Sequence, residues 1–166
     1  MEVSMKLRFK KIKVQKKDDR IYLEYENVQG EEVLHEQMLR SADKARPEFH
    51  LALQALRTDV IEMCELPETD ADYIIVKSIS LSWAGPEQTM GCTITAQKTL
   101  KKSMCPLLLN TPHKIEKFYA EHGDERALLS YNCLANIREV IKEAGLYLNG
   151  ERAQQALPLD AAVSTN

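Results

Sequence analysis

Hydrophobic residues in this chain follow two different spacings in successive regions. The order of these regions restricts the fold more than any other feature. Apolar and polar residues alternate within residues 5–38 and again within 73–109, and a stretch with apolar residues three and four positions apart follows each region. Alternation is typical of half-buried β-strands, whereas the longer spacing is typical of amphipathic helices. The sequence therefore predicts the order βββ-α-βββ-α. This is an α+β fold with a mainly antiparallel sheet, not a βαβ nucleotide-binding fold.

The alternation in residues 5–15 changes parity part-way along. Leu7 and Phe9 share one parity, whereas Ile12 and Val14 share the other. One extra residue near 10–11, a β-bulge, would return all four side chains to the same face. We therefore predict a bulge there, with the four apolar side chains facing the core and five basic residues on the outer face. The five are Lys6, Arg8, Lys10, Lys11 and Lys13.

The remaining elements follow from the same two patterns. Further strands are expected over residues 21–26, 33–38, 73–83, 90–97 and 107–109. A helix is expected from Pro47 to Leu66, ended by Pro67, and a second helix is expected to be capped by Asp124 and to end at Gly150. Residues 1–150 are predicted to form one domain, and residues 151–166 a flexible tail.

Composition argues against several classes of protein. The 166 residues are 44% hydrophobic and 28% charged, which is typical of a globular domain. No window approaches the roughly 18 apolar residues of a membrane-spanning helix, and the charged residues 1–20 are unlike a secretory signal. The four cysteines lie far apart without a CxxC pair, which indicates reduced thiols and a cytoplasmic location.

Basic residues are concentrated at the start of the chain. Residues 1–17 contain seven Lys or Arg residues and one acidic residue, Glu2, although the whole chain has a net charge of −3. A local basic strip attracts phosphate backbones even on an acidic body. The alternative interpretation is a lysine-rich edge strand protected against aggregation. The candidate nucleic-acid-binding residues are Lys6, Arg8, Lys10, Lys11, Lys13, Lys16 and Lys17.

Hydroxyl residues occupy one parity of two predicted strands. Ser78, Ser80 and Ser82 are expected opposite a face formed by Ile75, Ile79, Leu81 and Trp83, and the next strand presents Thr93, Thr95 and Gln97. Such a surface can hydrogen-bond a sugar–phosphate backbone or a nucleotide, with Tyr22 and Trp83 as candidates for base stacking. The alternatives are a solvent-facing antiparallel sheet and two aromatic residues that belong to the core.

Motifs for catalysis and metal binding are not found in the sequence. None of His35, His50, His113 and His122 has a partner at the short spacings typical of zinc sites, and His35-Glu36 does not continue to HExxH. The sequence also contains no GxSxG motif and no phosphate-binding glycine loop. We therefore expect no metal, no cofactor and no enzymatic activity. Residues 110–114 form a polar turn of the kind that often has a function.

The last residues contain the spacing Q-x-x-L-x-L, formed by Gln154, Leu157 and Leu159. This spacing resembles the short peptide through which bacterial replication and repair proteins dock on the sliding clamp. In those peptides the glutamine forms hydrogen bonds and the apolar residues fill a pocket. The resemblance implies the sliding clamp as a partner. The pattern departs from the family in ending with leucine rather than phenylalanine, and in placing Pro158 between the leucines.

Four stretches resemble small proteins of tailed phages and prophages of gut bacteria, a group with no established activity. They are residues 80–85, 90–96, 106–113 and 150–154. The resemblance implies a bacterial cytoplasm and a role in phage DNA metabolism or in countering host defence. We expect a non-catalytic accessory protein that binds nucleic acid, in particular single-stranded DNA. The alternative is a phage inhibitor that binds a host defence protein or sequesters a small nucleotide signal.

Overall fold

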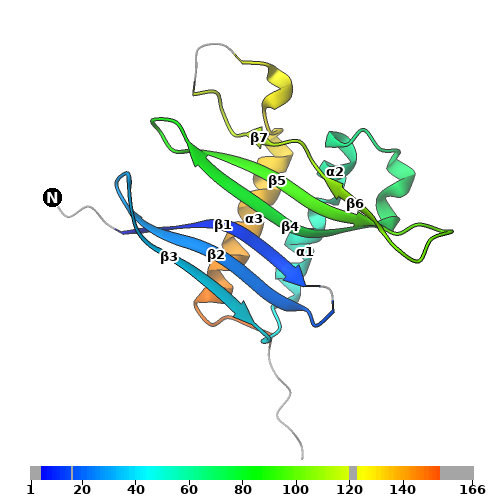
Figure 1. Ribbon diagram of the computed structural model, residues 1–166, viewed down its shortest axis with the longest axis horizontal. Coiled ribbons are helices and arrows are strands. Elements are labelled where there is room, and N and C mark those ends of the chain that lie inside the picture. Colours follow the sequence, from blue (N-terminus) through cyan, green and yellow to red (C-terminus); the bar gives the residue numbers. More distant parts are fainter. Residues whose placement is uncertain (1–4, 16, 120–122, 154–166) are drawn as a thin grey trace, which may run out of the picture.

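The computed structural model describes residues 5–15, 17–119 and 123–153. It contains one antiparallel sheet with the strand order β3-β2-β1-β4-β5-β6, and β7 also pairs with β5 (Figure 1). The strands are β1 (Lys6–Gln15), β2 (Arg20–Gln29), β3 (Glu32–Ser41), β4 (Ile74–Ala84), β5 (Thr89–Lys98), β6 (Leu107–Asn110) and β7 (Lys114–Ile115). The helices are α1 (Pro47–Ala55), α2 (Arg57–Met63) and α3 (Tyr131–Leu148), with short 3-10 helices η1 (Glu68–Tyr73) and η2 (Glu125–Ala127).

The sheet consists of two three-stranded meanders joined at their first strands. Strands β1–β3 form one meander and β4–β6 form the other, and β1 pairs with β4 where the two meet. The predicted α+β class and the antiparallel sheet are confirmed. The sequence pattern did not predict the two-residue strand β7.

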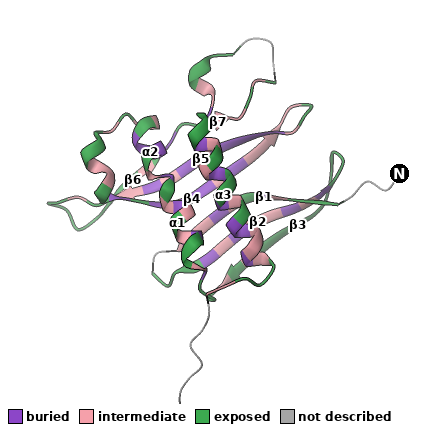
Figure 2. Cartoon of the chain, turned by 180° about the vertical axis from the view of Figure 1, so that it is seen from behind, coloured by how far each residue is buried: buried purple, intermediate pink, exposed green. Residues whose placement is uncertain are grey.

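All three α-helices pack against one face of the sheet, which Figure 2 shows from behind. Ile12, Ile79 and Ile94 form a row across β1, β4 and β5 on this face, and each is at most 1% exposed. Helices α1 and α3 close the core, with the rings of Phe49 and Tyr147 6.2 Å apart. We call the opposite side of the sheet the open face.

Bulges in β1 and β4 set which of their residues reach the open face, and a third register shift lies between Asn27 and Val28 where β2 pairs with β3. The predicted bulge in β1 is confirmed, since the register with β2 shifts between Phe9 and Lys11. A second bulge lies between Val76 and Ser78 in β4. This bulge makes the predicted face of Ile75 wrong: the core receives Val76, while Ile75 is 36% exposed. Leu7 is also exposed, at 41%, although we predicted that it would face the core.

Both predicted helices need correction at their boundaries. The first is two helices that meet at Leu56, whose N–H donates to the Leu53 carbonyl three residues back at 3.2 Å. The second begins seven residues after its predicted cap: Ser130 accepts a hydrogen bond from the Cys133 N–H at the start of α3. Asp124 instead caps η2. Gly150 follows the end of α3 with φ of +94°, a conformation that favours glycine.

The basic strand is not at an edge of the sheet. Strand β1 pairs with β2 along its length and with β4 at Lys11, Ile12 and Lys13, so the interpretation as a protected edge strand is wrong for that stretch. In the described part of the chain, no helix is long and apolar enough to cross a membrane.

Candidate nucleic-acid interface

Cross-strand register brings the basic residues and the hydroxyl residues onto the open face together. Lys13 lies directly opposite Ser78, and Lys11 lies opposite Ser80. On β5, Thr95 and Thr93 continue these two rows. Directly paired residues project from the same side of a sheet, so the lysines and the hydroxyls form one surface. The sequence alone indicated both sets but could not establish that β1 and β4 are neighbours.

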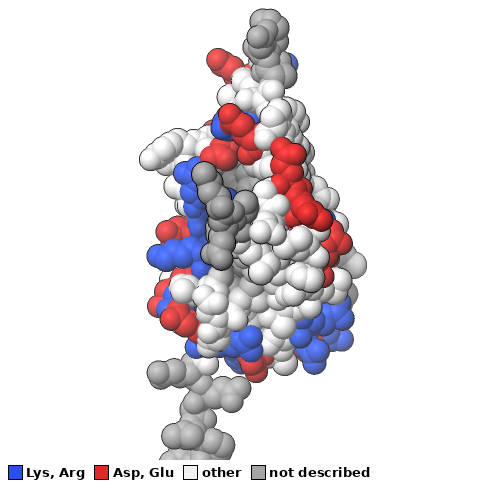
Figure 3. Space-filling model, turned by 90° about the vertical axis from the view of Figure 1, so that its left-hand side faces the viewer, with Lys and Arg blue, Asp and Glu red and all other residues white. Residues whose placement is uncertain are grey.

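Acidic residues interrupt the basic strip. Arg8 donates from Nε to Glu26 Oε1 at 2.5 Å, and Glu26 is only 3% exposed. Lys10 lies 3.8 Å from Glu36 of β3. Lys11 is paired in register with Glu24. Figure 3 shows one side of the molecule, where basic side chains form separate groups with acidic and uncharged surface between them.

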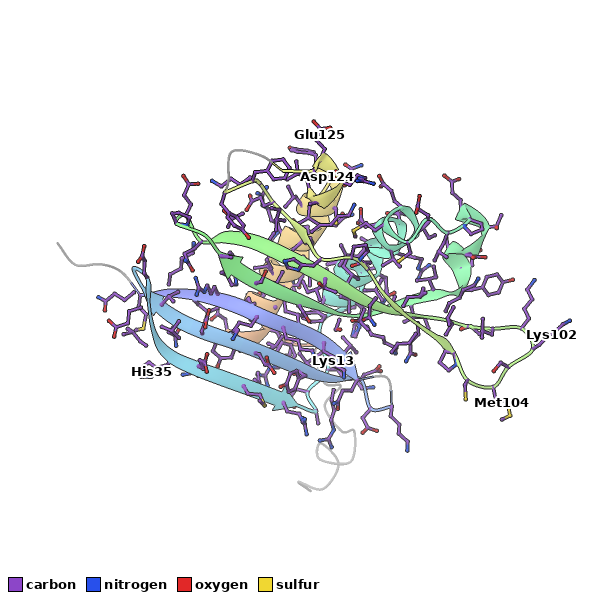
Figure 4. The ribbon with its side chains drawn as sticks, turned by 45° about the horizontal axis from the view of Figure 1, so that its top comes forward. Lys13, His35, Lys102, Met104, Asp124 and Glu125 are labelled. Atoms are coloured by element: carbon purple, nitrogen blue, oxygen red, sulfur yellow. The ribbon has the colours of Figure 1, made fainter. Side chains whose placement is uncertain are left out.

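Lys13 is placed differently from Arg8, Lys10 and Lys11. Its neighbours in register are Tyr22 on β2 and Ser78 on β4, both uncharged at neutral pH. None of the ion pairs between described residues involves Lys13. Figure 4 places its side chain toward the end of β1 that leads into β2. Of the other predicted bases, Lys6 and Lys17 are exposed, whereas Lys16 lies outside the described residues.

The hydroxyl rows differ in their accessibility. Ser78 is only 4% exposed because its neighbours cover it, whereas Ser80, Ser82, Thr93 and Thr95 are half-buried. Thr95 donates from Oγ1 to Asn110 Oδ1 at 2.8 Å, which extends the polar surface to β6.

The two candidate aromatic residues have different surroundings. Tyr22 lies on the open face, with the Arg40 guanidinium 5.6 Å from its ring centroid. Its hydroxyl donates to Glu24 at 2.5 Å, and this carboxylate raises the pKa of the Tyr22 hydroxyl. Trp83 donates from Nε1 to the Phe9 carbonyl at 3.0 Å and therefore links β4 to β1. Tyr22 is the better placed of the two for stacking on a base.

His113 also belongs to the open face, although the sequence indicated only the turn around it. Its Nε2 lies 3.3 Å from Ser82 Oγ, and its Nδ1 lies 3.3 Å from Thr93 Oγ1. The imidazole therefore lies between the two strands that carry the hydroxyl rows. The sequence showed only that His113 lies in a polar turn, and nothing in that pattern indicates which strands the turn contacts.

The buried cysteines have no features of reactive thiols. Burial raises the pKa of Cys133 to about 12 and also raises the pKa of Cys92 above its ordinary value. Asp59 lies beside them, and burial raises the pKa of its carboxyl even though Asn136 donates to it at 3.0 Å. Only the thiolate is a good nucleophile, so these groups favour a structural role. In the described ranges, no three His, Cys, Asp or Glu side chains are grouped to hold a metal ion.

The predicted docking residues Gln154, Leu157 and Leu159 lie outside the described residues. Just before them, the Ala153 N–H donates to the Lys44 carbonyl at 2.8 Å, and Arg152 forms an ion pair with Asp43. Comparisons with protein-family models, with curated proteins and with solved structures find no match.

Proposed function

We propose that the open face binds single-stranded DNA and that the protein is a non-catalytic accessory factor of phage DNA metabolism. The observation that carries this proposal is the register that places Lys11 directly beside the half-buried Ser80, and Lys13 in line with Thr95 across the buried Ser78. Phosphate contacts need cations and hydrogen-bond donors side by side along a groove or face, and this pairing supplies both. Tyr22 adds an aromatic ring on the same surface.

The charge pattern favours a single strand over a long duplex. Glu24 and Glu36 lie beside Lys11 and Lys10, so a duplex laid along the strip would meet acidic side chains. A flexible single strand can cross the sheet from Lys13 to Thr95, over the buried Ser78, and avoid them. Bases would then stack on Tyr22.

The test is fluorescence anisotropy with a labelled 20-nucleotide thymidine oligomer at several low salt concentrations. We expect salt-sensitive binding by the unaltered protein and at least tenfold weaker binding by Lys13→Glu. Lys142→Glu is the matched control, because it makes the same charge change on an exposed position of α3, away from the open face. Absence of a salt-sensitive shift in the unaltered protein, or equal losses in both variants, would contradict the proposal.

A second candidate function is inhibition of a host protein, which the exposed edge of the sheet favours. Strand β3 is paired only with β2 and carries exposed Val33, Leu34 and Met38. Unpaired edge strands are sites for β-augmentation by another chain. Affinity capture from host lysate, followed by mass spectrometry of proteins and released nucleotides, tests this candidate. Recovery of neither a stoichiometric partner nor a ligand would count against it.

The sliding clamp is the partner that the tail would recruit. Surface plasmon resonance on immobilised clamp tests this proposal with the full chain and a chain that ends at Ala153. Gln154→Ala with Leu157→Ala in the full chain is the point-substitution control. Equal binding by all three proteins would exclude the tail as the docking peptide.

A further inference from the structure

The loop that carries His113 is fixed at both ends. On one side, Thr111 Oγ1 accepts a hydrogen bond from the Ile94 N–H at 2.8 Å, and the Thr111 N–H donates to the Ile94 carbonyl at 2.9 Å. On the other side, β7 pairs with Gly91 and Cys92 of β5. His113 itself is exposed. A rigid attachment therefore holds an exposed imidazole over the open face.

The imidazole ring of His113 occupies the space where a side chain at position 91 would lie, because residue 91 is glycine. A Cβ built on Gly91 would lie 2.5 Å from His113 Nε2 and 2.6 Å from Ser82 Oγ, so any larger residue would displace the ring. Ser82 is the cross-strand partner of Gly91, and Thr93 is the partner of Ser80. The absent side chain at Gly91 leaves the space in which the ring contacts both hydroxyls.

Protonation of the imidazole would change what these hydroxyls offer to a ligand. In neutral imidazole one ring nitrogen donates and the other accepts, so one of the two hydroxyls must donate its hydrogen to the ring. In imidazolium both nitrogens donate, and the hydrogens of both Ser82 and Thr93 are released toward solvent. Imidazoles change charge between about pH 5 and 8. The protonated cluster combines one positive charge with two outward donors, which suits a phosphate oxygen.

The charged groups around His113 come from β1 and from its own segment. From β4 and β5 it contacts the hydroxyls of Ser82 and Thr93 and lies over Gly91, and β1 contributes Lys11 across Ser80. On its own segment, Lys114 lines a cavity with Asp59, Glu62 and Glu125 on the helix side of the sheet. Farther along the chain, Glu116 is held by Arg138, and Lys117 is paired with Glu87. Among the described residues, the ring hydrogen-bonds only to the two hydroxyls.

A catalytic role for the same contacts is weaker. A serine beside a histidine nitrogen is the arrangement of a nucleophile and its base. Here the other ring nitrogen contacts the Thr93 hydroxyl, which carries no charge to stabilise imidazolium as a carboxylate does. The Ser82 contact is also long for a catalytic hydrogen bond, at 3.3 Å.

We propose that His113, Ser82 and Thr93 form a phosphodiester subsite that is occupied when the imidazole is protonated. The subsite rests on the proposed function, because the phosphodiester belongs to the strand that crosses the open face. Lys11 lies on the other side of Ser80 and can reach the same phosphate through its flexible stem. Binding of the strand then strengthens as the pH falls.

The first experiment compares affinity for the labelled thymidine oligomer at pH 6 and pH 8 at one salt concentration. The unaltered protein is expected to bind about threefold to fivefold more tightly at pH 6, the effect of one exposed charge contact. His113→Gln removes the titration and should abolish the difference. Gly91→Ala keeps the histidine but displaces its ring, and should do the same. His35→Gln is the matched control, since His35 lies on exposed β3 (Figure 4) and should leave the difference intact.

The second experiment separates this subsite from the proposed function. The ring resonances of His113 are followed by NMR during titration with the dinucleotide d(TpT), whose phosphodiester keeps one charge across this pH range. The subsite is supported if the His113 resonances shift saturably with d(TpT) at pH 6 and do not shift in Gly91→Ala. This result would support the subsite even if the longer oligomer does not bind. Oligomer binding whose pH dependence persists in His113→Gln leaves the proposed function standing and overturns the subsite. Absence of saturable shifts also overturns it.

Discussion

The two halves of the open face differ in how they carry polarity, although each is a three-stranded antiparallel meander. On β1–β3 the polar residues are charged, and lysine or arginine lies near glutamate, as in Arg8 with Glu26. On β4–β6 the corresponding rows are hydroxyls and an amide, as in Ser78, Thr95 and Asn110. The two meanders therefore share a topology but differ in surface charge. On β1–β3 basic and acidic side chains neutralise one another, whereas the polar rows of β4–β6 carry no charge.

This difference restricts where a polyanion can bind. On the charged half, most cations already have a carboxylate nearby, so a phosphate would have to compete with it. On the uncharged half, donors are available but cations are few. Lys11 and Lys13 lie at the boundary, where β1 meets β4, directly opposite Ser80 and Ser78. The boundary is consequently the part of the sheet best suited to phosphate contacts.

Among substitutions that disturb this charge arrangement, replacement of Glu26 is expected to have the largest effect on stability. We expect Glu26→Ala to lower the free energy of unfolding by about 3 kcal/mol, because it leaves the Arg8 guanidinium partly buried without its carboxylate. Urea denaturation measures the loss. A double-mutant cycle with Arg8→Ala should recover part of it, since removing both charges leaves no unpaired ion. A loss below about 1 kcal/mol would show that the pair is solvated, as a surface ion pair is.

On the helix side of the second half, Asp59 of α2 is buried and forms an ion pair with none of the described residues. Burial raises the pKa of the Asp59 carboxyl, and its hydrogen-bond donor Asn136 is neutral. A carboxyl with a raised pKa in the folded state contributes stability below the ordinary value of 3.8, and that contribution is lost as the pH rises through the folded pKa. Ionised Asp59 therefore destabilises the protein at neutral pH.

Asp59→Asn should accordingly raise the free energy of unfolding at pH 7 by about 1 kcal/mol, because a neutral amide can accept the same hydrogen bond without a buried charge. Chemical denaturation between pH 4 and 7 measures the effect, which should shrink toward pH 4. An unchanged pH profile, or a loss of stability at pH 7, would show that the carboxylate is stabilised by a group other than Asn136.

The sequence predicted the element order and the first bulge because both depend on local periodicity. Leu7 and Phe9 cannot share a face with Ile12 and Val14 without an insertion, and β1 contains one. The bulge in β4 was missed because Ile74 and Val76 are apolar along with Ile75, so parity alone left the inward face ambiguous. The start of α3 was misplaced because Asp124 and Ser130 are both good caps, and only tertiary packing selects between them.

The candidate site could be predicted only as separate parts. Its lysines and hydroxyls were visible as residue patterns, but their adjacency depends on the β1–β4 pairing, which joins residues more than 60 positions apart. Likewise, His113 could not be assigned to the hydroxyl rows from sequence, because its contact with Ser82 depends on how the segment 111–115 packs along β5.

Charge reversal at the boundary should have a smaller effect on stability, and the two lysines should differ. Lys11→Glu places a carboxylate directly opposite Glu24 and should cost about 0.7 kcal/mol. Lys13→Glu faces Tyr22 and Ser78 and should change the free energy of unfolding by less than about 0.3 kcal/mol. Urea denaturation at low salt compares the two. Unfolding of either variant would mean that the lysine is packed or paired and would remove the main support for phosphate binding there.

A comparably small effect is expected at the exposed ion pair between Lys10 and Glu36. Their charged atoms are 3.8 Å apart, and the side chains remain 44% and 71% exposed, so water screens the attraction. Lys10→Ala and Glu36→Ala should each change the free energy of unfolding by less than about 0.5 kcal/mol. Glu36→Ala should nevertheless strengthen oligonucleotide binding slightly, because it removes an acidic side chain from the strip. Glu36→Ala could instead destabilise the protein as much as Glu26→Ala. In that case burial would not distinguish the two ion pairs, and the stability of the charged half would depend equally on all of its carboxylates.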